Sequence, residues 1–213
     1  MSSGLPFPPD LVRLPAFEPG MRIGLFGGSF DPPHDGHREV SLVALKRLGL
    51  DQVWWLVSPR NPLKPKAPSE DLARRIAAAK RLARHPRIKV TGVEAALGTT
   101  YTAESLRRLA PRLRGIDAVW MMGADNLASF HRWRDWPAIA ATMPIAVFNR
   151  PGQALRALSS PGAQALAGHR IPESAAADLA GMRPPAWVFL SSPHIRLSST
   201  DLRAARSRAK STS

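Results

Sequence analysis

The sequence predicts an α/β protein with a doubly wound parallel sheet, and three observations lead to this fold class. Short apolar runs recur at residues 22–26, 52–57, 88–93, 118–122, 145–148 and 187–190. Segments with helical spacing of apolar residues separate most of these runs. A pair of glycines, Gly27 and Gly28, follows the first run. Strands that alternate with helices pair in parallel through crossovers, so we expect a ligand site at their carboxyl ends.

The helices are indicated by apolar periodicity and by residues that favour helix ends. Residues 36–48 have helical spacing and stop before Gly49. Acidic Glu70 and Asp71 suit the first turn of a second helix, where they meet its positive end. Thr102 is a plausible N-cap for a third. Residues 137–142 are expected to form a short helix, and a basic helix is expected after the last strand.

The chain is expected to fold as one domain, because 213 residues lie within the size of a single hydrophobic core. Residues 1–20 are rich in proline and are interpreted as an extended arm before a domain at 21–213. Residues 61–68 can only be a loop. Residues 151–184 have a weak pattern and are interpreted as an irregular insertion with room for one short helix.

Composition narrows the class of protein. Thirty Lys and Arg against 16 Asp and Glu give a net charge of +14, which favours anionic partners without choosing among them. The chain has no cysteine, which excludes disulfides, thiolate catalysis and cysteine-bound metals. A signal-peptide pattern and a run of about 20 apolar residues are both missing, so a cytoplasmic protein without membrane contact is expected.

The segment GGSFDPPHDGH, residues 27–37, is the first candidate for binding chemistry. It follows the first predicted strand and opens a helix, where backbone amides and the helix dipole favour an anion. Gly27 and Gly28 allow backbone to approach a phosphate closely, and His34 and His37 could both donate hydrogen bonds to a triphosphate. Two alternatives stay open. The histidines could simply cap the helix, or bind a metal with Asp31 or Asp35.

A second segment, LSSTDLR at residues 197–203, follows the last predicted strand. Its hydroxyls, the free amides of a helix start and Arg203 would suit a phosphate. Taken alone, it could equally be an ordinary N-cap formed by Ser198 or Ser199.

Together, GGSFDPPHDGH and LSSTDLR resemble the HxGH and ISSTxIR motif pair of the nucleotidylyltransferase superfamily, specifically the bacterial nicotinate-nucleotide adenylyltransferase family. The resemblance extends in order through five further features. These are the loop NPLKPK, the segment TYTAESL at 100–106, GADNL at 123–127, Trp133 and the stretch 149–152. The arm and the insertion lie outside it.

The resemblance implies a Rossmann-like sheet of the nucleotidylyltransferase type. It also implies that ATP and nicotinate mononucleotide combine to give deamido-NAD and pyrophosphate. In such enzymes the mononucleotide phosphate attacks the α-phosphorus of ATP in line, with Mg²⁺ on the phosphates and no covalent enzyme intermediate. Catalysis then consists of positioning and charge stabilisation.

The resemblance also implies roles for individual residues. The catalytic residues would be His34 and His37. The ATP phosphates would be bound by Gly27, Gly28, Ser29, Lys64, Ser199, Thr200 and Arg203. The nucleotide cleft would include Phe26, Gly123 and Asp125. The nicotinate nucleotide would lie by Thr102, Trp133 and Arg134. No side chain is assigned as a metal ligand.

Three points are left open by the sequence. Arg134 stands where relatives often have tyrosine, and a direct contact with the nicotinate carboxylate is a hypothesis. Tyr101 could be a cleft residue or a core side chain. Trp133 could belong to a surface aromatic cluster with Trp136.

Other functions remain as alternatives. The chain could act on phosphopantetheine or another small substrate, or accept nicotinamide mononucleotide. A nucleic-acid-binding protein would explain the charge, although we find no zinc-finger, RNP or clear helix-turn-helix pattern. An oligomer is possible, and no specific nucleic acid partner is expected.

Overall fold

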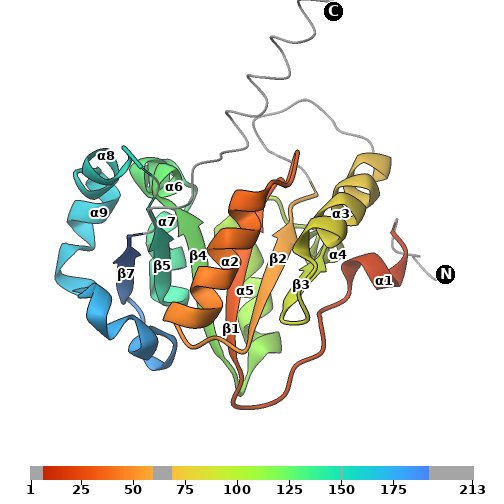
Figure 1. The fold of residues 1–213 in the computed structure, drawn as a ribbon, viewed down its shortest axis with the longest axis horizontal. Helices are drawn as coiled ribbons and strands as arrows, with labels where there is room; N and C mark the ends of the chain where they lie inside the picture. The colour runs from red at the N-terminus through yellow and green to blue at the C-terminus, as the bar shows by residue number, and fades with distance from the viewer. Residues whose placement is uncertain (1–6, 60–68, 150, 192–213) are drawn as a thin grey trace, which may run out of the picture.

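The computed structural model describes residues 7–59, 69–149 and 151–191. These residues form a seven-stranded, all-parallel sheet in the order β3-β2-β1-β4-β5-β7-β6, with helices on both faces (Figure 1). The strands are β1 (Arg22–Gly28), β2 (Gln52–Val57), β3 (Ile88–Thr91), β4 (Asp117–Gly123), β5 (Ile145–Phe148), β6 (Arg170–Ile171) and β7 (Trp187–Leu190). The predicted doubly wound α/β fold is confirmed.

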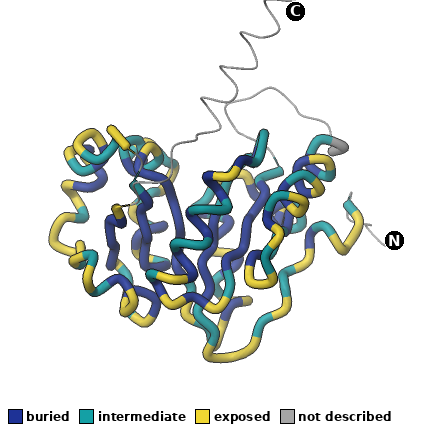
Figure 2. The backbone as a smooth tube through the Cα atoms, viewed as in Figure 1, coloured by how far each residue is buried: buried dark blue, intermediate teal, exposed yellow. Residues whose placement is uncertain are grey.

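Successive residues of the central strands point into two separate hydrophobic cores. In β2, Trp55 belongs to the core under α2 (Asp35–Arg47) and α3 (Ser69–Ala83). Its neighbour Trp54 belongs to the core under α5 (Thr102–Leu109) and α7 (Trp136–Thr142). Figure 2 shows the strands buried between partly exposed helices. Because parallel strands covered on both faces read as continuous apolar runs, most of these strands could be recognised in the sequence.

The order of the strands fixes where a ligand site can form. From β1 the chain winds outward through α2, β2 and α3 to β3, and then returns to place β4 on the other side of β1. The return passes through α4 (Val93–Leu97), α5 and η1 (Ala110–Leu113). Connections therefore leave β1 and β4 toward opposite faces. This topological switch point opens a crevice at the carboxyl ends of the two strands.

The N-terminal arm packs against the domain and is not wholly extended as the sequence suggested. It contains one turn of helix, α1 (Pro9–Val12). The Gly92 amide donates to the Leu11 carbonyl at 2.7 Å, and the Thr91 hydroxyl donates to the Arg13 carbonyl at 2.7 Å. The ring of Phe17 lies 5.6 Å from that of Trp54, centroid to centroid. The arm thus follows the edge of the sheet at β3.

The segment 151–184 contains more regular structure than the sequence predicted. It forms α8 (Ala154–Leu158), α9 (Pro161–Ala165), η3 (Ala167–His169), β6 and η4 (Glu173–Gly181). Four of these five elements have five residues or fewer, and β6 pairs with β7 over only two residues. Pieces as short as these four carry too few residues to show a period. The insertion is therefore a chain of short helical segments interrupted by the edge strand β6, and its last element is the nine-residue η4.

Several boundaries differ from the predictions: β1 extends to Gly28 rather than to residue 26, and β4 spans Asp117–Gly123 rather than 118–122. The third strand ends at Thr91 rather than at residue 93, because the Thr91 hydroxyl accepts the Val93 amide at 3.1 Å as α4 begins. Thr102 is the first residue of α5, and the N-cap is Tyr101. The predicted loop 61–68 and the predicted C-terminal helix lie outside the described residues.

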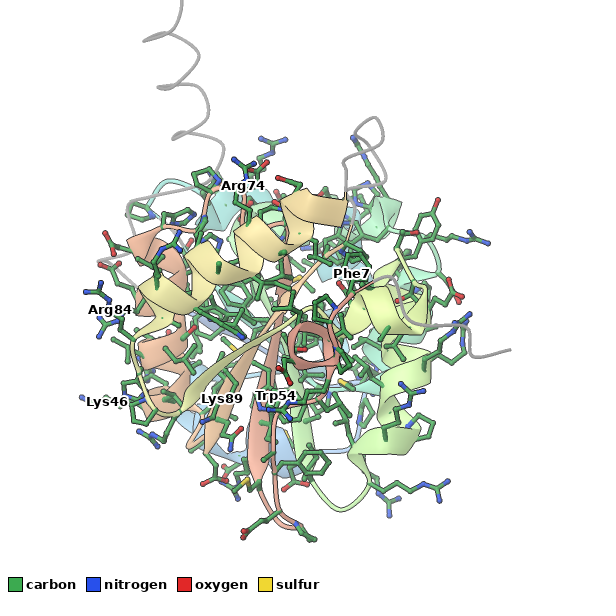
Figure 3. All side chains as sticks on the ribbon, turned by 90° about the vertical axis from the view of Figure 1, so that its right-hand side faces the viewer. Phe7, Lys46, Trp54, Arg74, Arg84 and Lys89 are labelled. Carbon is green, nitrogen blue, oxygen red and sulfur yellow. The ribbon has the colours of Figure 1, made fainter. Side chains whose placement is uncertain are left out.

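Within the part of the chain that the structure describes, no helix is long and apolar enough to cross a membrane. Among the described residues, the basic side chains lie largely at the surface. Lys46, Arg74 and Arg84 are exposed on the side that carries α3 (Figure 3). A share of the net charge therefore faces solvent rather than the crevice.

We expect the contact of the arm with the sheet to contribute to stability. Phe17→Ala removes a half-buried ring that packs on Trp54, and should lower the free energy of unfolding by about 1–2 kcal/mol. Urea unfolding followed by circular dichroism measures this. Leu155→Ala is the control, because that side chain is 83% exposed and its removal should cost less than about 0.5 kcal/mol. Equal effects of the two substitutions would contradict a packed arm.

Candidate active site

A cleft of about 550 Å³ lies at the switch point, and segments from both halves of the sheet line it. β1 and its turn contribute Gly27, Gly28 and Ser29, and the end of β2 contributes Ser58. The far wall is formed by residues of α4, α5, β4, α6 (Ala124–Ser129), η2 (Phe130–Arg132) and the chain after it. These residues are Glu94, Thr100, Tyr101, Thr102, Trp120, Asn126, Ser129, Arg132, Trp133 and Arg134.

Gly27 is required by the close approach of β1 and the Trp120 side chain. A Cβ placed on Gly27 would lie 2.4 Å from the edge of the indole ring, a distance that real Cβ atoms do not adopt. The ring is 98% buried, so it has little room to move. The first glycine of the motif therefore serves packing beneath the cleft as well as access to it.

The turn after β1 is held by a buried aromatic ring. Phe30 has a left-handed backbone, with φ of 47°, which is uncommon for a residue other than glycine. Its ring is 1% exposed and stacks on Trp55, with centroids 5.0 Å apart and planes 16° apart. Burial of the ring offsets the cost of the backbone conformation.

The two histidines lie together at the start of α2. Their ring centroids are 3.8 Å apart, and His34 is the N-cap residue. The His34 amide donates to Nδ1 of His37 at 3.1 Å. Because Nδ1 accepts a hydrogen bond, the neutral ring of His37 carries its proton on Nε2. The capping alternative is therefore present in the structure, and it orients His37 as an Nε2–H donor.

Glu94 is a buried acid in the cleft wall. The residue is 6% exposed, and burial raises the pKa of its carboxyl above the ordinary 4.5. Hydrogen bonds with the Ser105 and Ser58 hydroxyls act in the opposite direction on the pKa but do not cancel the effect. Ser105 in turn lies 2.8 Å from the Thr99 hydroxyl oxygen. The carboxyl is thus part of a polar network that joins the end of β2 to α5.

Arginine and aromatic residues form the rim of the cleft. The guanidinium of Arg134 lies 4.8 Å from the centroid of the Tyr101 ring, a cation–π contact. Tyr101 is 36% exposed, so it is a cleft residue and not a core side chain. Trp133 packs edge-on against the buried ring of Phe130, at 5.6 Å and 71°. With Arg132 and Arg134 at the rim, the cleft favours anionic ligands.

The cleft brings together some of the sequence-predicted site residues. Gly27, Gly28, Ser29, Thr102, Trp133 and Arg134 line it. Five others belong to neighbouring elements and do not contribute to the lining, namely Phe26, His34, His37, Gly123 and Asp125. Lys64, Ser199, Thr200 and Arg203 lie outside the described residues. The proposed roles of all these residues stay predictions.

Two buried charged residues were not predicted from the sequence. Glu94 escaped notice because the strand prediction ran to residue 93 and α4 was not foreseen. Arg75 is 6% exposed and hydrogen-bonds to the turn after β1. A signal for Arg75 exists, because at helical spacing it falls beside Leu72 and Ala79 on the apolar face of α3.

The comparisons with known proteins agree with this architecture. The model of the cytidylyltransferase-like family matches residues 25–205. A "probable nicotinate-nucleotide adenylyltransferase" of Cereibacter sphaeroides is 56% identical over 184 residues, which cover 86% of this chain and 97% of that one. A protein of the same name from Rhizobium meliloti is 55% identical, with 88% and 100% covered. The chain belongs to the nicotinate-nucleotide adenylyltransferase family.

A solved structure shows the same fold at low identity. Plasmodium falciparum nicotinic acid mononucleotide adenylyltransferase, complexed with NaAD, is 16% identical and has a TM-score of 0.60. The match covers 85% of this chain and 82% of that one. The α/β fold of the family is thus kept where most of the sequence has changed.

Glu94 provides a test of the buried acid. A carboxyl with a raised pKa in the folded state stabilises the protein less as pH rises from about 4.5 through the folded-state pKa, because the unfolded chain ionises first. Glu94→Gln removes this titration, so it should gain stability relative to wild type above pH 4.5, by about 1.4 kcal/mol for each tenfold change in proton affinity.

The measurement is urea unfolding of both proteins at several pH values between about 4 and 8, a range that begins near the ordinary pKa of a glutamate carboxyl and extends well above it. Glu104→Gln on α5 is the control, because the Glu104 side chain is 38% exposed. A stability difference between wild type and Glu94→Gln that does not change with pH would show that Glu94 is not a perturbed acid.

Proposed function

We propose that this chain transfers the AMP group of ATP to nicotinate mononucleotide, giving deamido-NAD and pyrophosphate. The observation that carries the proposal is the cleft itself. In it, the glycine turn after β1 faces a wall of Tyr101, Thr102, Trp133 and Arg134 across the switch point. Its volume lies within the range of about 300–1,000 Å³ typical of small-molecule sites. Two phosphate-bearing substrates suit its basic rim.

The reaction needs no nucleophile from the protein. An oxygen of the mononucleotide phosphate forms a bond to the α-phosphorus of ATP, and the bond from that phosphorus to the pyrophosphate oxygen breaks. Negative charge grows on the oxygens around the phosphorus. We propose that backbone amides of Gly28 and Ser29 and the Nε2–H of His37 stabilise it, with His34 beside them. One aimed donor of this kind contributes about 10²–10³ in rate.

The remaining phosphate contacts rest on the motif resemblance. In this proposal Lys64, Ser199, Thr200 and Arg203 hold the β- and γ-phosphates. Phe26, Gly123 and Asp125 stay assigned to the nucleotide cleft.

Mg²⁺ enters the proposal with the ATP phosphates. Mg²⁺ keeps several waters and commonly takes substrate phosphate oxygens as ligands. Residues 7–59, 69–149 and 151–191 contain no group of three or more His, Asp or Glu side chains that could hold a metal ion. In this proposal the substrate phosphates are the ligands, and the ion would neutralise part of their charge. A cytoplasmic location and the oligomeric state stay predictions.

The central test is pyrophosphate release from ATP with Mg²⁺ and nicotinate mononucleotide. We expect release that depends on the mononucleotide, and a fall in kcat of about 10²–10³ in His37→Ala. His169→Ala is the control, since that side chain is exposed on η3. Wild type that releases no pyrophosphate, or does so with phosphopantetheine instead, would refute the proposed reaction. Near-normal His37→Ala would refute only the role of His37.

Arg134 gives a second test, directed at substrate selectivity. Its guanidinium is held at the rim by the Tyr101 ring, where a carboxylate could reach it. Arg134→Ala should raise KM for nicotinate mononucleotide about tenfold and reduce the preference over nicotinamide mononucleotide, because a charged hydrogen bond contributes roughly 1.5–3 kcal/mol. KM for ATP should not change. Arg112→Ala, an exposed arginine on η1, is the control. An unaltered KM for nicotinate mononucleotide would rule out the contact.

A further inference from the structure

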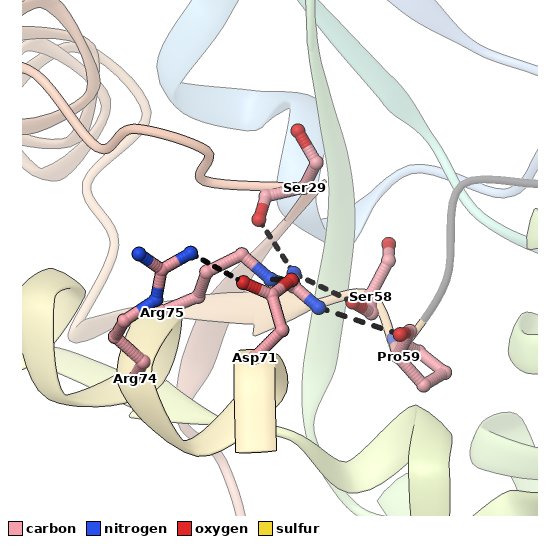
Figure 4. A network of polar contacts seen from close by, with 6 residues as sticks. All are labelled: Ser29, Ser58, Pro59, Asp71, Arg74 and Arg75. Atoms are coloured by element: carbon pink, nitrogen blue, oxygen red, sulfur yellow. Dashed lines mark hydrogen bonds and ion pairs between the residues drawn. The ribbon is translucent and has the colours of Figure 1, made fainter. Parts of the chain in front are cut away.

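Arg75 is a buried arginine that reaches the walls of the cleft from behind. It lies on α3, and its side chain is only 7% exposed. It does not line the cleft, but two residues that do, Ser29 and Ser58, accept hydrogen bonds from it through their backbone carbonyls. Figure 4 shows the guanidinium between these two segments. Its hydrogen bonds thus give Arg75 a route to a ligand through Ser29 and Ser58.

The guanidinium uses its N–H groups on three carbonyls and one carboxylate. Nη1 donates to Ser29 at 2.7 Å and to Ser58 at 2.8 Å, and Nη2 donates to the Pro59 carbonyl at 3.3 Å. Nε donates to Asp71, one turn earlier on α3, at 2.9 Å. The planar fork of arginine can make these bonds at the same time, whereas a lysine ammonium on its single stem cannot match the geometry.

These bonds extend the pairing of β1 and β2 beyond the end of the sheet. The last backbone bond between the two strands runs from the Ser58 amide to the Gly28 carbonyl, at 2.9 Å. One residue further on, the carbonyls of Ser29 and Ser58 have passed the end of the ladder, and buried carbonyls need a donor. Arg75 supplies that donor to both. It thereby fixes the distance between the two strand ends at the mouth of the cleft.

The position of the Ser29 carbonyl also sets the start of the following turn. In a trans peptide the N–H points away from the carbonyl, so anchoring the Ser29 oxygen fixes the direction of the Phe30 amide. Phe30 has the left-handed backbone described above. Ser58 is held from its other side through its hydroxyl by Glu94. The walls around Ser29 and Ser58 are therefore built on Arg75.

We propose that Arg75 is a positioning residue for the adenylyl transfer, which holds the Ser29 turn and Ser58 at the spacing that ATP phosphates require. The inference rests on the proposed function. Asp71, whose pKa is lowered by the hydrogen bond from Arg74 and by the charge of Arg75, is shared by the two arginines and offsets part of the charge of Arg75. The role assigned to Arg75 is geometric, because its hydrogen bonds hold the backbone carbonyls of the two strand ends.

Arg74 provides a matched control on the same helix. It also pairs with Asp71, at 2.7 Å, but its side chain is 76% exposed, and among the described residues it donates its hydrogen bond to Asp71 and not to the strand ends. Substituting either arginine by Gln removes the same charge and one ion pair with the same carboxylate, and substituting either by Lys keeps the charge. The two positions differ in burial and in the bonds to the three carbonyls.

The experiment compares Arg75→Lys and Arg75→Gln with Arg74→Lys and Arg74→Gln. We expect the Arg75 variants to lose about 10–10² in kcat/KM for ATP, the size of effect that a misplacement of about 1 Å produces. KM for nicotinate mononucleotide should stay within about twofold, since its assigned contacts are elsewhere; a factor of two corresponds to roughly 0.4 kcal/mol. The Arg74 variants should resemble wild type. Melting temperatures and circular dichroism establish that each protein is folded.

A second measurement covers the case in which the Arg75 variants fold poorly. Asp71→Asn leaves Arg75 in place but loosens its orientation, and should give a smaller loss in kcat/KM for ATP than Arg75→Lys. Added guanidinium ion at low concentration should restore part of the activity of Arg75→Ala, whereas the same concentration of sodium chloride should not.

The outcomes separate the two proposals. A folded Arg75→Lys with wild-type kcat/KM for ATP overturns the positioning role. Equal losses toward both substrates, in proportion to the loss of melting temperature, also overturn it and leave Arg75 with a role in folding alone. Wild type that makes no pyrophosphate refutes the proposed function instead. In that case titration calorimetry with ATP still tests the positioning role of Arg75. This role predicts that Arg75→Lys binds ATP more weakly than Arg74→Lys does.

Discussion

The contact between Gly27 and the indole ring of Trp120 is the constraint on which the cleft depends. The two residues lie on β1 and β4, the neighbouring strands at which the winding of the sheet reverses. A parallel sheet opens a crevice at this point in any case. The Trp120 ring fills the floor of that crevice up to the backbone of β1, so the backbone itself becomes the surface that a ligand meets. The turn that follows β1 contains Phe30 and leads to the paired histidines. Phe30 packs in the core on the other face of the sheet from Trp120.

Polar groups buried around this floor give the site its rigidity. Glu94 and Arg75 hold the end of β2 from opposite sides, and each is a charged residue type placed where water is largely excluded. Such groups are costly unless they are hydrogen-bonded, and both are. The hydrogen bonds that satisfy these two buried groups also fix the position of Ser58. The cleft is thus supported by bonds that lie outside it.

The sequence predicted the strands well and the polar supports poorly, for physical reasons. The bounds of β2, β5 and β7 could be predicted to the residue because a strand buried on both faces is a continuous apolar run. Burial of Glu94 or Arg75 depends on partners far away in the chain, such as Ser58, and leaves at most a weak local signal. The histidine pair was recognised as important, but the choice between capping and phosphate binding could not be made. The bond from the His34 amide to His37 shows that capping orients a donor and so does not compete with the second role.

The arm that lies along β3 affects whether two copies of the protein can pair through the edges of their sheets. The strand at each edge of a sheet has unpaired backbone groups, to which a strand of another molecule can add. At one end the last strand, β6, has two residues, too few to make a useful template. At the other end, Leu11 and Arg13 of the arm take up backbone and hydroxyl donors at Gly92 and Thr91, beside the longer strand β3. Both margins of the sheet are thereby poorly suited to intermolecular β-pairing, the first step toward aggregation.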